Sequence, residues 1–342
     1  MSPKKKDSTS KKFDSTRRDF VITAAAGTAL ALAAPSLGFG QDTNGKMPKR
    51  RLGRTGEMVS LITVGGLHTT WKEKEPDVPE QIVEEEGIKV VRGALDMGVN
   101  FLDNAWSYNA GRSEEMMGKA LKDGYRKKAL VMTKILARNL DDAKKQLETS
   151  LKRYQLDSID LMQFHALGAW EQDVDTIYNG GFLDWAMEMK SQKVFKYIGF
   201  TGHNNPAVHL DMIKRGFEWD TVQMPINVVD YHNKESSFER DVLPEALKRD
   251  IGVIAMKTNG YGRPWFAGVT NPLDGLRYAM TLPVSTVASG MTSEAIMKEN
   301  VGSTLDFKPF SKKEMAAYRD GLLDKSLLAQ EHYRSDPIPK KN

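Results

Sequence analysis

Eight short apolar segments recur along the chain from residue 60 onward, and they are rich in residues that favour β-strands. They span residues 60–65, 100–103, 129–134, 159–165, 197–201, 221–225, 252–256 and 285–288. Stretches with the apolar spacing of amphipathic helices follow them, at residues 79–97, 113–122, 140–154, 181–192, 207–215, 238–249, 273–280 and 292–301. Ser113 and Ser293 stand where a side chain caps the first turn of a helix.

The alternation of apolar strands with helices predicts an α/β protein. Eight parallel βαβ units in about 300 residues fit a closed (β/α)8 TIM barrel. An open doubly wound sheet is the alternative, but it typically carries a Gly-x-Gly-x-x-Gly turn after an early strand. The chain lacks that turn, because Gly260 and Gly262 are followed by Arg-Pro-Trp. Residues 50–56 predict a tight turn between two short strands, an N-terminal β-hairpin across the barrel bottom.

Residues 1–40 have the layout of a signal peptide. Five lysines precede Arg17 and Arg18, and an apolar stretch of about 14 residues follows, shorter than the roughly 20 residues that span a bilayer. The paired arginines before Asp-Phe-Val resemble the twin-arginine (Tat) export signal. We therefore expect two parts, a twin-arginine signal peptide at 1–40 and the barrel at 41–342. The resemblance implies a bacterial protein exported to the periplasm by the Tat machinery, without a stable membrane anchor.

Charge and cysteine content narrow the classes of function. Residues 1–40 hold seven Lys and Arg against three Asp, a net charge of +4 that equals the net charge of the whole chain. The remainder is therefore close to neutral, which does not indicate a nucleic-acid partner. The chain has no cysteine, which excludes disulfides, thiolate metal sites and a cysteine nucleophile.

Polar side chains stand at three neighbouring strand ends, the usual location of reactive groups in such barrels. Asp103 ends the second predicted strand, Lys134 the third and His165 the fourth, and Tyr108 follows in the loop after Asp103. A phenol has a pKa near 10, so we expect Lys134 to lower it and Asp103 to keep Lys134 charged. A neutral His165 could orient a substrate carbonyl. Each residue alone has an ordinary structural explanation; the combination points to carbonyl reduction with a hydride from a cofactor.

The polar strand ends belong to longer motifs, at residues 51–56, 103–108 (Asp-Asn-Ala-Trp-Ser-Tyr), 111–114 (Gly-Arg-Ser-Glu), 118–121, 133–134, 163–165 and 196–200. Together these motifs resemble those of the aldo-keto reductase superfamily over essentially the whole chain after residue 47. The resemblance implies that Tyr108 is the general acid, that Lys134 tunes it, that Asp103 supports Lys134 and that His165 orients the substrate. It implies NAD(P)H-dependent reduction of an aldehyde or ketone to an alcohol, or the reverse, with a small-molecule carbonyl or alcohol as substrate.

The resemblance also implies a set of cofactor-binding residues, and it favours NADP(H) with NAD(H) possible. Two departures from the family pattern stand out. Gly202 replaces an asparagine that grips the nicotinamide amide, and Thr292 and Ile296 occupy positions where basic residues often hold a 2′-phosphate. The implied cofactor-binding residues are Thr201, Gln223, Met256, Lys257, Gly260, Gly290, Glu299 and Asn300.

Two other functions remain open. Asp103, His165 and His203 stand at strand ends where a barrel hydrolase could bind a divalent metal, although that reading leaves Tyr108 and Lys134 without a role. The altered end of the fifth strand suggests the second alternative, a non-catalytic, cofactor-binding regulatory barrel. We expect the protein to be an enzyme that uses no metal ion.

Overall fold

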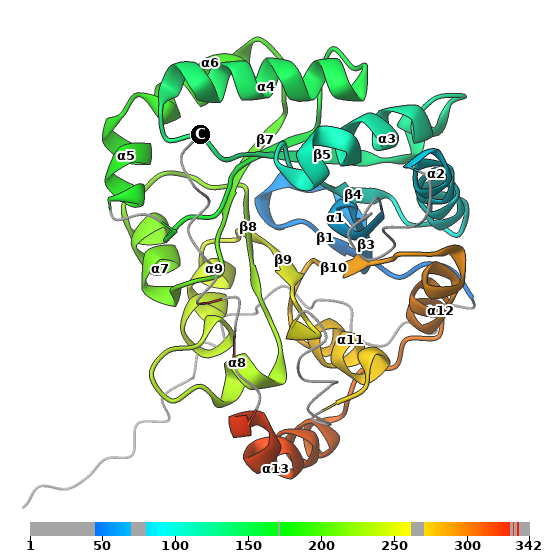
Figure 1. Cartoon of the computed structure of the whole chain (residues 1–342). Helices are drawn as coiled ribbons and strands as arrows, with labels where there is room; N and C mark the ends of the chain where they lie inside the picture. The colour runs from blue at the N-terminus through cyan, green and yellow to red at the C-terminus, as the bar shows by residue number, and fades with distance from the viewer. Residues whose placement is uncertain are drawn as a thin grey trace, which may run out of the picture. The chain divides into compact units, whose positions relative to one another are not determined.

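Eight parallel strands close into a barrel at the centre of the protein, as predicted (Figure 1). The computed structural model describes residues 45–69, 80–169, 172–260, 270–328, 331 and 334. The barrel order is β10-β3-β4-β5-β6-β7-β8-β9. Its strands are β3 (Ile62–Gly65), β4 (Phe101–Asp103), β5 (Leu130–Ile135), β6 (Leu161–Phe164), β7 (Tyr197–Thr201), β8 (Thr221–Pro225), β9 (Gly252–Met256) and β10 (Thr286–Gly290).

The strand register brings the expected site residues to one rim of the barrel. Because all eight strands are parallel, their carboxyl ends share that rim. Gly65 pairs with Asp103, and Thr201 pairs with Gln223. Lys134 lies one residue before the end of β5. Gly65 also pairs with Gly290 at the end of β10, so strand ends that are 225 residues apart in the chain meet.

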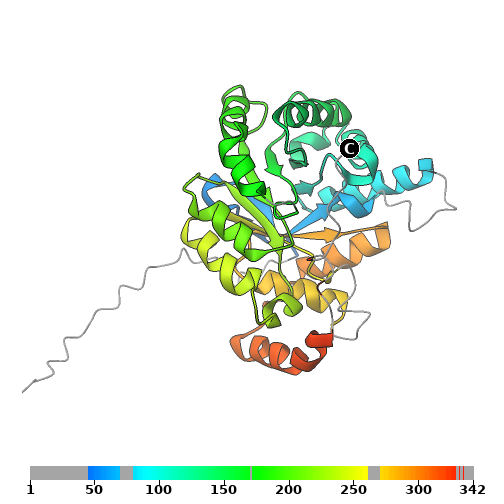
Figure 2. The same ribbon diagram turned by 60° about the vertical axis from the view of Figure 1, so that its left-hand side comes forward.

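Helices form an outer layer around the barrel (Figures 1 and 2). The eight helices that the periodicity predicts are present as α2 (Glu80–Asp96), α3 (Arg112–Ala120), α4 (Leu140–Tyr154), α6 (Phe182–Ser191), α7 (Pro206–Lys214), α9 (Leu243–Lys248), α11 (Pro272–Thr281) and α12 (Glu294–Leu305). A π-helical turn, Phe238–Val242, precedes α9 within the predicted segment 238–249. The described residues also contain the helices α1 (Gly66–Thr69), α5 (Asp173–Asn179), α8 (Val228–His232) and α13 (Lys312–Leu328). Helix α13, red in Figure 1, packs against α8 through an apolar cluster that contains Val228, Val229 and Met315.

The two predicted serine caps have different outcomes. Ser293 caps α12, because its hydroxyl accepts a hydrogen bond from the Ile296 N–H. The prediction for Ser113 is wrong, since α3 begins at Arg112 and the Ser113 hydroxyl donates to the Gly66 carbonyl oxygen at 3.0 Å. Ser113 therefore joins α3 to the turn after β3 instead of capping a helix.

The predicted N-terminal hairpin closes the barrel bottom. Strands β1 (Lys49–Arg51) and β2 (Met58–Ser60) pair antiparallel around the 3-10 turn Gly53–Thr55. Leu52 and Val59 pack with apolar residues from the barrel interior: Phe101, Met132, Leu161 and Ile254. A Cβ on Gly53 would lie 2.1 Å from the Gly252 nitrogen, so this close approach requires glycine. Ser60 belongs to the hairpin, which is why the first barrel strand starts later than predicted.

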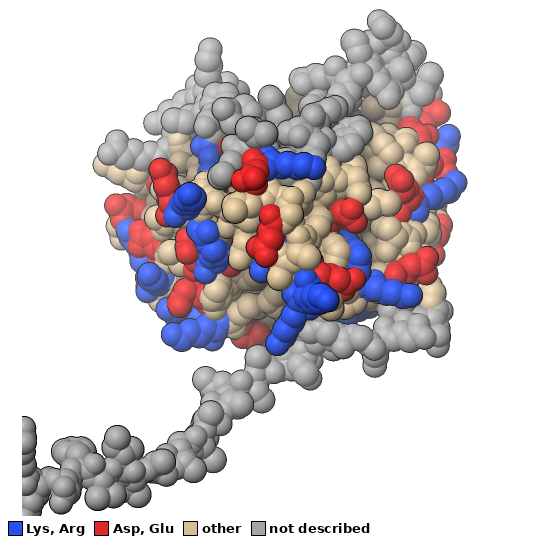
Figure 3. All heavy atoms as spheres, turned by 90° about the horizontal axis from the view of Figure 1, so that it is seen from below, with Lys and Arg blue, Asp and Glu red and all other residues tan. Residues whose placement is uncertain are grey.

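The described residues all belong to one compact unit, Leu37–Asn342. On the face drawn in Figure 3, basic and acidic side chains are interspersed and form no field of one sign. Among the described residues, none of the helices combines the length and apolar character that crossing a bilayer requires. The predicted signal peptide at 1–40 lies outside the described residues.

Candidate active site

Four side chains predicted to act together converge at the rim. Asp103 is the last residue of β4, Lys134 lies near the end of β5, and His165 directly follows β6. Tyr108 begins a short 3-10 helix, Tyr108–Gly111, five residues after Asp103. The structure brings the four together, whereas their catalytic roles stay predictions.

Lys134 is the centre of this group. Its Nζ forms a short ion pair with Oδ1 of Asp103 and donates to the Asn104 carbonyl oxygen at 2.8 Å. It also donates to the phenol oxygen of Tyr108 at 3.2 Å. The Lys134 side chain is only 1% exposed, so these three oxygens replace the water that an ammonium otherwise binds. Lys134 is thereby aimed at the phenol oxygen, as the resemblance implies.

The pKa of Tyr108 moves in the direction opposite to our expectation. Burial and the Asp103 carboxylate raise the pKa of this phenol well above its usual value. Burial also lowers the pKa of Lys134, while Asp103 and Glu114 oppose that shift. We expected Lys134 to lower the pKa of Tyr108, but withdrawal from water dominates. The phenol is therefore held protonated, as a proton donor must be.

His165 lies beside Tyr108 as an uncharged ring. The two ring centroids are 5.7 Å apart in an edge-to-face arrangement. Burial, with further contributions from Lys134 and other cations, lowers the pKa of His165 well below its usual value. Its Nδ1 is buried and has no hydrogen-bond partner among the described residues. A neutral imidazole at this place can hydrogen-bond a carbonyl oxygen without competing as an acid.

The loop that carries Tyr108 is strained and firmly held. Asn109 and Ala110 both have left-handed backbone angles, with φ of 50° and 55°. Asn109 Nδ2 donates to the Leu67 carbonyl oxygen and to the Ser113 hydroxyl, both at 2.9 Å. Strain of this kind persists only where surrounding contacts impose it, and it is often found at functional sites. The position of Tyr108 is thus set by tertiary contacts.

Sequence reasoning missed a residue that holds the same loop from the other side. Arg153, near the end of α4, donates to the Trp106 carbonyl oxygen at 2.8 Å and pairs with the buried Glu114 at 3.1 Å. A Cβ on Gly111 would lie 2.2 Å from Arg153 Cζ, so this packing requires glycine at 111. No local pattern marks Arg153, since it lies 47 residues from Trp106. The Gly-Arg-Ser-Glu motif could have indicated this contact, because it contains Gly111 and Glu114, the two residues against which Arg153 packs.

A second missed arginine holds the segment after β6. Arg138 donates to the His165 carbonyl oxygen at 2.6 Å and pairs with Asp173 at 2.5 Å. Asp173 in turn accepts from the Gly168 N–H at 2.8 Å. These contacts hold the backbone of His165 and of the segment after it in place.

Two of the implied cofactor residues lie beside the group that Lys134 centres, because Gln223 contacts Asp103. Thr201 ends β7 and pairs with Gln223, the middle residue of β8, and both are buried. Gln223 Nε2 donates to Oδ2 of Asp103 at 2.8 Å, while its Oε1 is buried without a partner among the described residues. An unbonded buried acceptor is what the amide group of a nicotinamide would satisfy. These residues therefore fit the cofactor that the resemblance implies.

The structure explains the departure at Gly202. A Cβ at this position would lie 2.2 Å from the Leu167 carbonyl oxygen. The Leu167 N–H donates to the Thr201 carbonyl oxygen at 2.9 Å, which holds this backbone against β7. The asparagine typical of the family therefore does not fit, and its contact with the nicotinamide is absent from position 202.

The other implied cofactor residues follow β9 and β10. Met256 ends β9, and Lys257 and Gly260 follow with positive φ angles of 55° and 49°. Gly290 ends β10, where a Cβ would lie 2.6 Å from His68 Nδ1. Glu299 is exposed on α12, and the buried Asn300 donates to the Ser289 hydroxyl at 3.1 Å. These residues lie on the β9–β10 side of the rim; Tyr261, Gly262 and Arg263 lie outside the described residues.

The metal-dependent alternative finds no support at this rim. Within the described part of the chain, no group of three or more His, Asp or Glu side chains could hold a metal ion. Both oxygens of Asp103 accept hydrogen bonds, from Lys134 and from Gln223.

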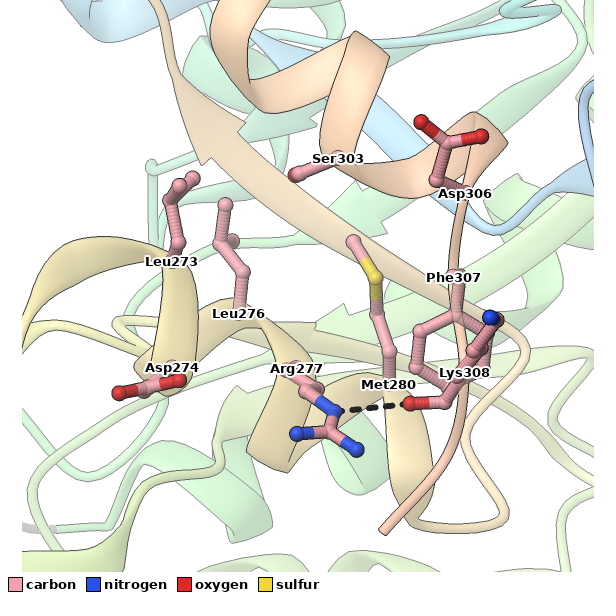
Figure 4. Close-up of a pocket in the computed structure, with 9 residues that line it drawn as sticks. All are labelled: Leu273, Asp274, Leu276, Arg277, Met280, Ser303, Asp306, Phe307 and Lys308. Carbon is pink, nitrogen blue, oxygen red and sulfur yellow. Dashed lines mark hydrogen bonds between the residues drawn. The ribbon is translucent and has the colours of Figure 1, made fainter.

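A cavity of about 340 Å³ lies elsewhere, between α11, α12 and residues 306–308 (Figure 4). Leu273, Leu276, Met280 and Phe307 supply apolar walls. Arg277 Nε donates to the Lys308 carbonyl oxygen at 2.8 Å beside them. None of the predicted site residues lines this cavity, so it is separate from the rim.

Comparison with known proteins agrees with this geometry. The sequence profile described as "Aldo/keto reductase family" matches residues 61–263. Aldo-keto reductase YhdN of Bacillus subtilis is 32% identical over 180 residues, which cover 49% of this chain and 50% of that protein. L-galactose dehydrogenase of Arabidopsis thaliana is 27% identical over 222 residues, which cover 61% of this chain and 65% of that protein. The matched segments thus span less than two thirds of both relatives.

Solved structures share the fold. The holo form of aldo-keto reductase AKR11C1 from Bacillus halodurans superposes with a TM-score of 0.65 at 22% identity, covering 84% of this chain and 99% of that one. An aldo-keto reductase from Klebsiella pneumoniae in complex with NADPH gives a TM-score of 0.64 at 16% identity. The match covers 86% of this chain and 97% of that one.

Proposed function

This chain belongs to the aldo/keto reductase family, and on that premise we propose that it reduces an aldehyde or ketone to an alcohol, or catalyses the reverse. A nicotinamide dinucleotide, when bound, supplies the hydride, because no side chain can. The observation that carries the proposal is Lys134, whose buried ammonium contacts both the Asp103 carboxylate and the Tyr108 phenol oxygen. That arrangement suits proton transfer to a carbonyl oxygen.

Each member of the group has a separate task in this proposal. Tyr108 gives its phenolic proton to the carbonyl oxygen, and the nearby Lys134 ammonium stabilises the phenolate that remains. Asp103 balances the charge of Lys134 inside the barrel. His165, uncharged at neutral pH, orients the carbonyl oxygen by a hydrogen bond. In the reverse direction the phenolate takes the proton of the alcohol.

Thr201 and Gln223 would hold the nicotinamide end of the dinucleotide, and Gln223 contributes its unbonded Oε1. Met256 would pack on the ring, and Lys257 and Gly260 would approach the pyrophosphate. Gly290, Glu299 and Asn300 would lie toward the adenosine end.

Replacing Tyr108 by phenylalanine tests the proposal directly. Purified wild type is assayed with NADH and NADPH against a panel of aldehydes and ketones, and dinucleotide binding is measured by fluorescence. We expect Tyr108→Phe to lose at least about 100-fold in kcat and to keep its dinucleotide affinity. Tyr125→Phe is the control, because this phenol contacts Asp96 at the other end of the barrel.

Two results would favour the alternatives. Equal inertness of wild type and Tyr108→Phe, together with tight dinucleotide binding, would point to a regulatory barrel. An activity that depends on a stoichiometric metal ion would point to a hydrolase and reject the reductase.

For residues 1–40 we propose a twin-arginine signal that exports the folded barrel to the periplasm. Its support is the Arg17-Arg18 pair with the apolar stretch after it. Replacing both arginines by lysine should retain the protein in the cytoplasm, as fractionation would reveal. Unchanged export of that variant would reject the assignment. Denaturing the periplasmic protein and identifying the released dinucleotide would test whether the cofactor travels with it.

A further inference from the structure

The N-terminus of α12 bears on which dinucleotide the protein selects. In (β/α)8 barrels, phosphate groups frequently bind at the loops after the seventh and eighth strands, beside a helix N-terminus. Here the eighth strand is β10, and residues 291–293 lead from it into α12. Glu299 and Asn300 on the same helix are the residues that the resemblance assigns to the adenosine end.

Two of the first three backbone N–H groups of α12, which a phosphate would use at this place, are already bonded within the chain. Glu294 N donates to Oε1 of Glu86, on α2, at 2.9 Å. Ile296 N donates to the Ser293 hydroxyl at 3.3 Å, and Met297 N donates to the Ser293 carbonyl oxygen at 2.9 Å. A carboxylate of the protein therefore occupies the position at which the helix dipole favours an anion.

The charges around this terminus are also unfavourable for a phosphate. Glu86, Glu294 and Glu299 contribute three carboxylates. The nearby lysines are paired with two of them, since Lys298 Nζ lies 3.3 Å from Glu294 and Lys89 Nζ lies 4.0 Å from Glu86. The side chains of Glu86 and Glu294 are 36% and 39% exposed, so neither carboxylate is shielded from solvent, and the three carboxylates outnumber the two lysines.

Nicotinamide dinucleotides differ at the adenosine ribose, which carries a 2′-hydroxyl in NAD(H) and a 2′-phosphate in NADP(H). Doubly wound dinucleotide-binding domains place an acidic residue beside the hydroxyl and an arginine beside the phosphate, and the same charge preference applies to these groups in a barrel. The first turn of α12 carries one acidic residue, Glu294, and Glu86 reaches it from α2. The exposed Ile296 stands where a basic side chain would be useful.

We infer that this protein selects NAD(H) over NADP(H), with Glu86 as the residue that excludes the 2′-phosphate. The inference rests on the proposed function, because it names the cofactor of that site. It departs from the preference for NADP(H) that the family resemblance implies. Glu86 acts here as a specificity-determining residue without any part in the proton transfer.

The test is a set of binding measurements on the full chain. NADH and NADPH are titrated separately, and dissociation constants are obtained from fluorescence or calorimetry. We expect wild type to bind NADH at least about tenfold more tightly than NADPH, a difference of roughly 1.4 kcal/mol. Glu86→Gln keeps an acceptor for the Glu294 N–H but removes the charge, so it should tighten NADPH binding about tenfold and change NADH binding little.

A second variant keeps the test decisive if Glu86→Gln folds poorly. Ile296→Arg adds a cation to an exposed position and leaves Glu86 in place, and it too should tighten NADPH binding selectively. Glu148→Gln, on the exposed face of α4, is the matched control and should change neither affinity.

The outcomes separate this inference from the proposed function. NADPH binding as tight as NADH binding in wild type would overturn the inference and leave the reductase intact. An unchanged affinity ratio in both variants would overturn the role of Glu86. Failure of both dinucleotides to bind would overturn the inference together with the proposed function.

Discussion

Nε2 of Gln223 donates a hydrogen bond to Oδ2 of Asp103 at 2.8 Å, across 120 positions of the chain. The other oxygen of the same carboxylate pairs with Lys134, which contacts Tyr108. A residue expected to hold the nicotinamide is thereby joined to the residues expected to transfer the proton. The proposed function therefore couples cofactor binding and positioning of the acid through a single buried carboxylate.

That coupling predicts the effect of Gln223→Leu. Loss of the donor leaves a buried carboxylate oxygen with one partner fewer, which should lower the free energy of unfolding by about 1–3 kcal/mol. Dinucleotide affinity and kcat should both fall. Gln163→Leu is the matched control, because its buried Nε2 donates to Thr221 at 3.0 Å and makes no contact with Asp103. Calorimetry and fluorescence titration would distinguish them; equal losses of affinity in both variants would argue against the coupling.

Lys134→Met should both inactivate and destabilise the protein. It removes the cation that balances Asp103, and an unpaired buried charge costs about 3–5 kcal/mol. Adding Asp103→Asn removes that charge, so the double variant should regain much of the stability and none of the activity. Denaturant unfolding and turnover assays measure the two effects. A double variant that is no more stable than Lys134→Met would contradict this account of the pair.

The pH dependence should differ between the two reaction directions. Because the pKa of His165 lies well below 6.5 and the pKa of Tyr108 lies well above 10, neither group titrates between about pH 7 and 9. Carbonyl reduction needs the neutral phenol and should keep a level kcat/KM across that range. Alcohol oxidation needs the phenolate, so its rate should rise with pH. An inflection near pH 6.5 that disappears in His165→Asn would contradict the lowered pKa.

Ala110→Gly should stabilise the loop that carries Tyr108. Ala110 is exposed and holds a left-handed conformation, φ 55°, that glycine adopts without strain. Relief of that strain should raise the free energy of unfolding by about 0.5–1 kcal/mol in thermal or denaturant unfolding. Asn109→Gly is the contrast: φ there is also positive, but the change deletes the side-chain bonds to Leu67 and Ser113. A loss of stability in Ala110→Gly would show that the loop is not strained.

Much of the barrel was predictable because its strands are buried on both faces and read as apolar runs. The predicted strands 197–201, 221–225 and 252–256 coincide with β7, β8 and β9. The strand-end rule then located Asp103, Lys134 and His165 without any knowledge of their contacts. The cap assigned to Ser113 failed because the hydroxyl finds a partner in Gly66, which is distant in sequence.

The amino-acid sequence by itself determined the barrel, its N-terminal hairpin and the strand ends at which polar residues gather, since apolar periodicity and strand ends are local properties. Only the tertiary structure decided which atoms meet. Closing the barrel puts Gln223 on Asp103, Arg153 under the Tyr108 loop and Glu86 at the start of α12. It also reversed the expected shift in the pKa of Tyr108, because the extent of burial depends on the whole fold.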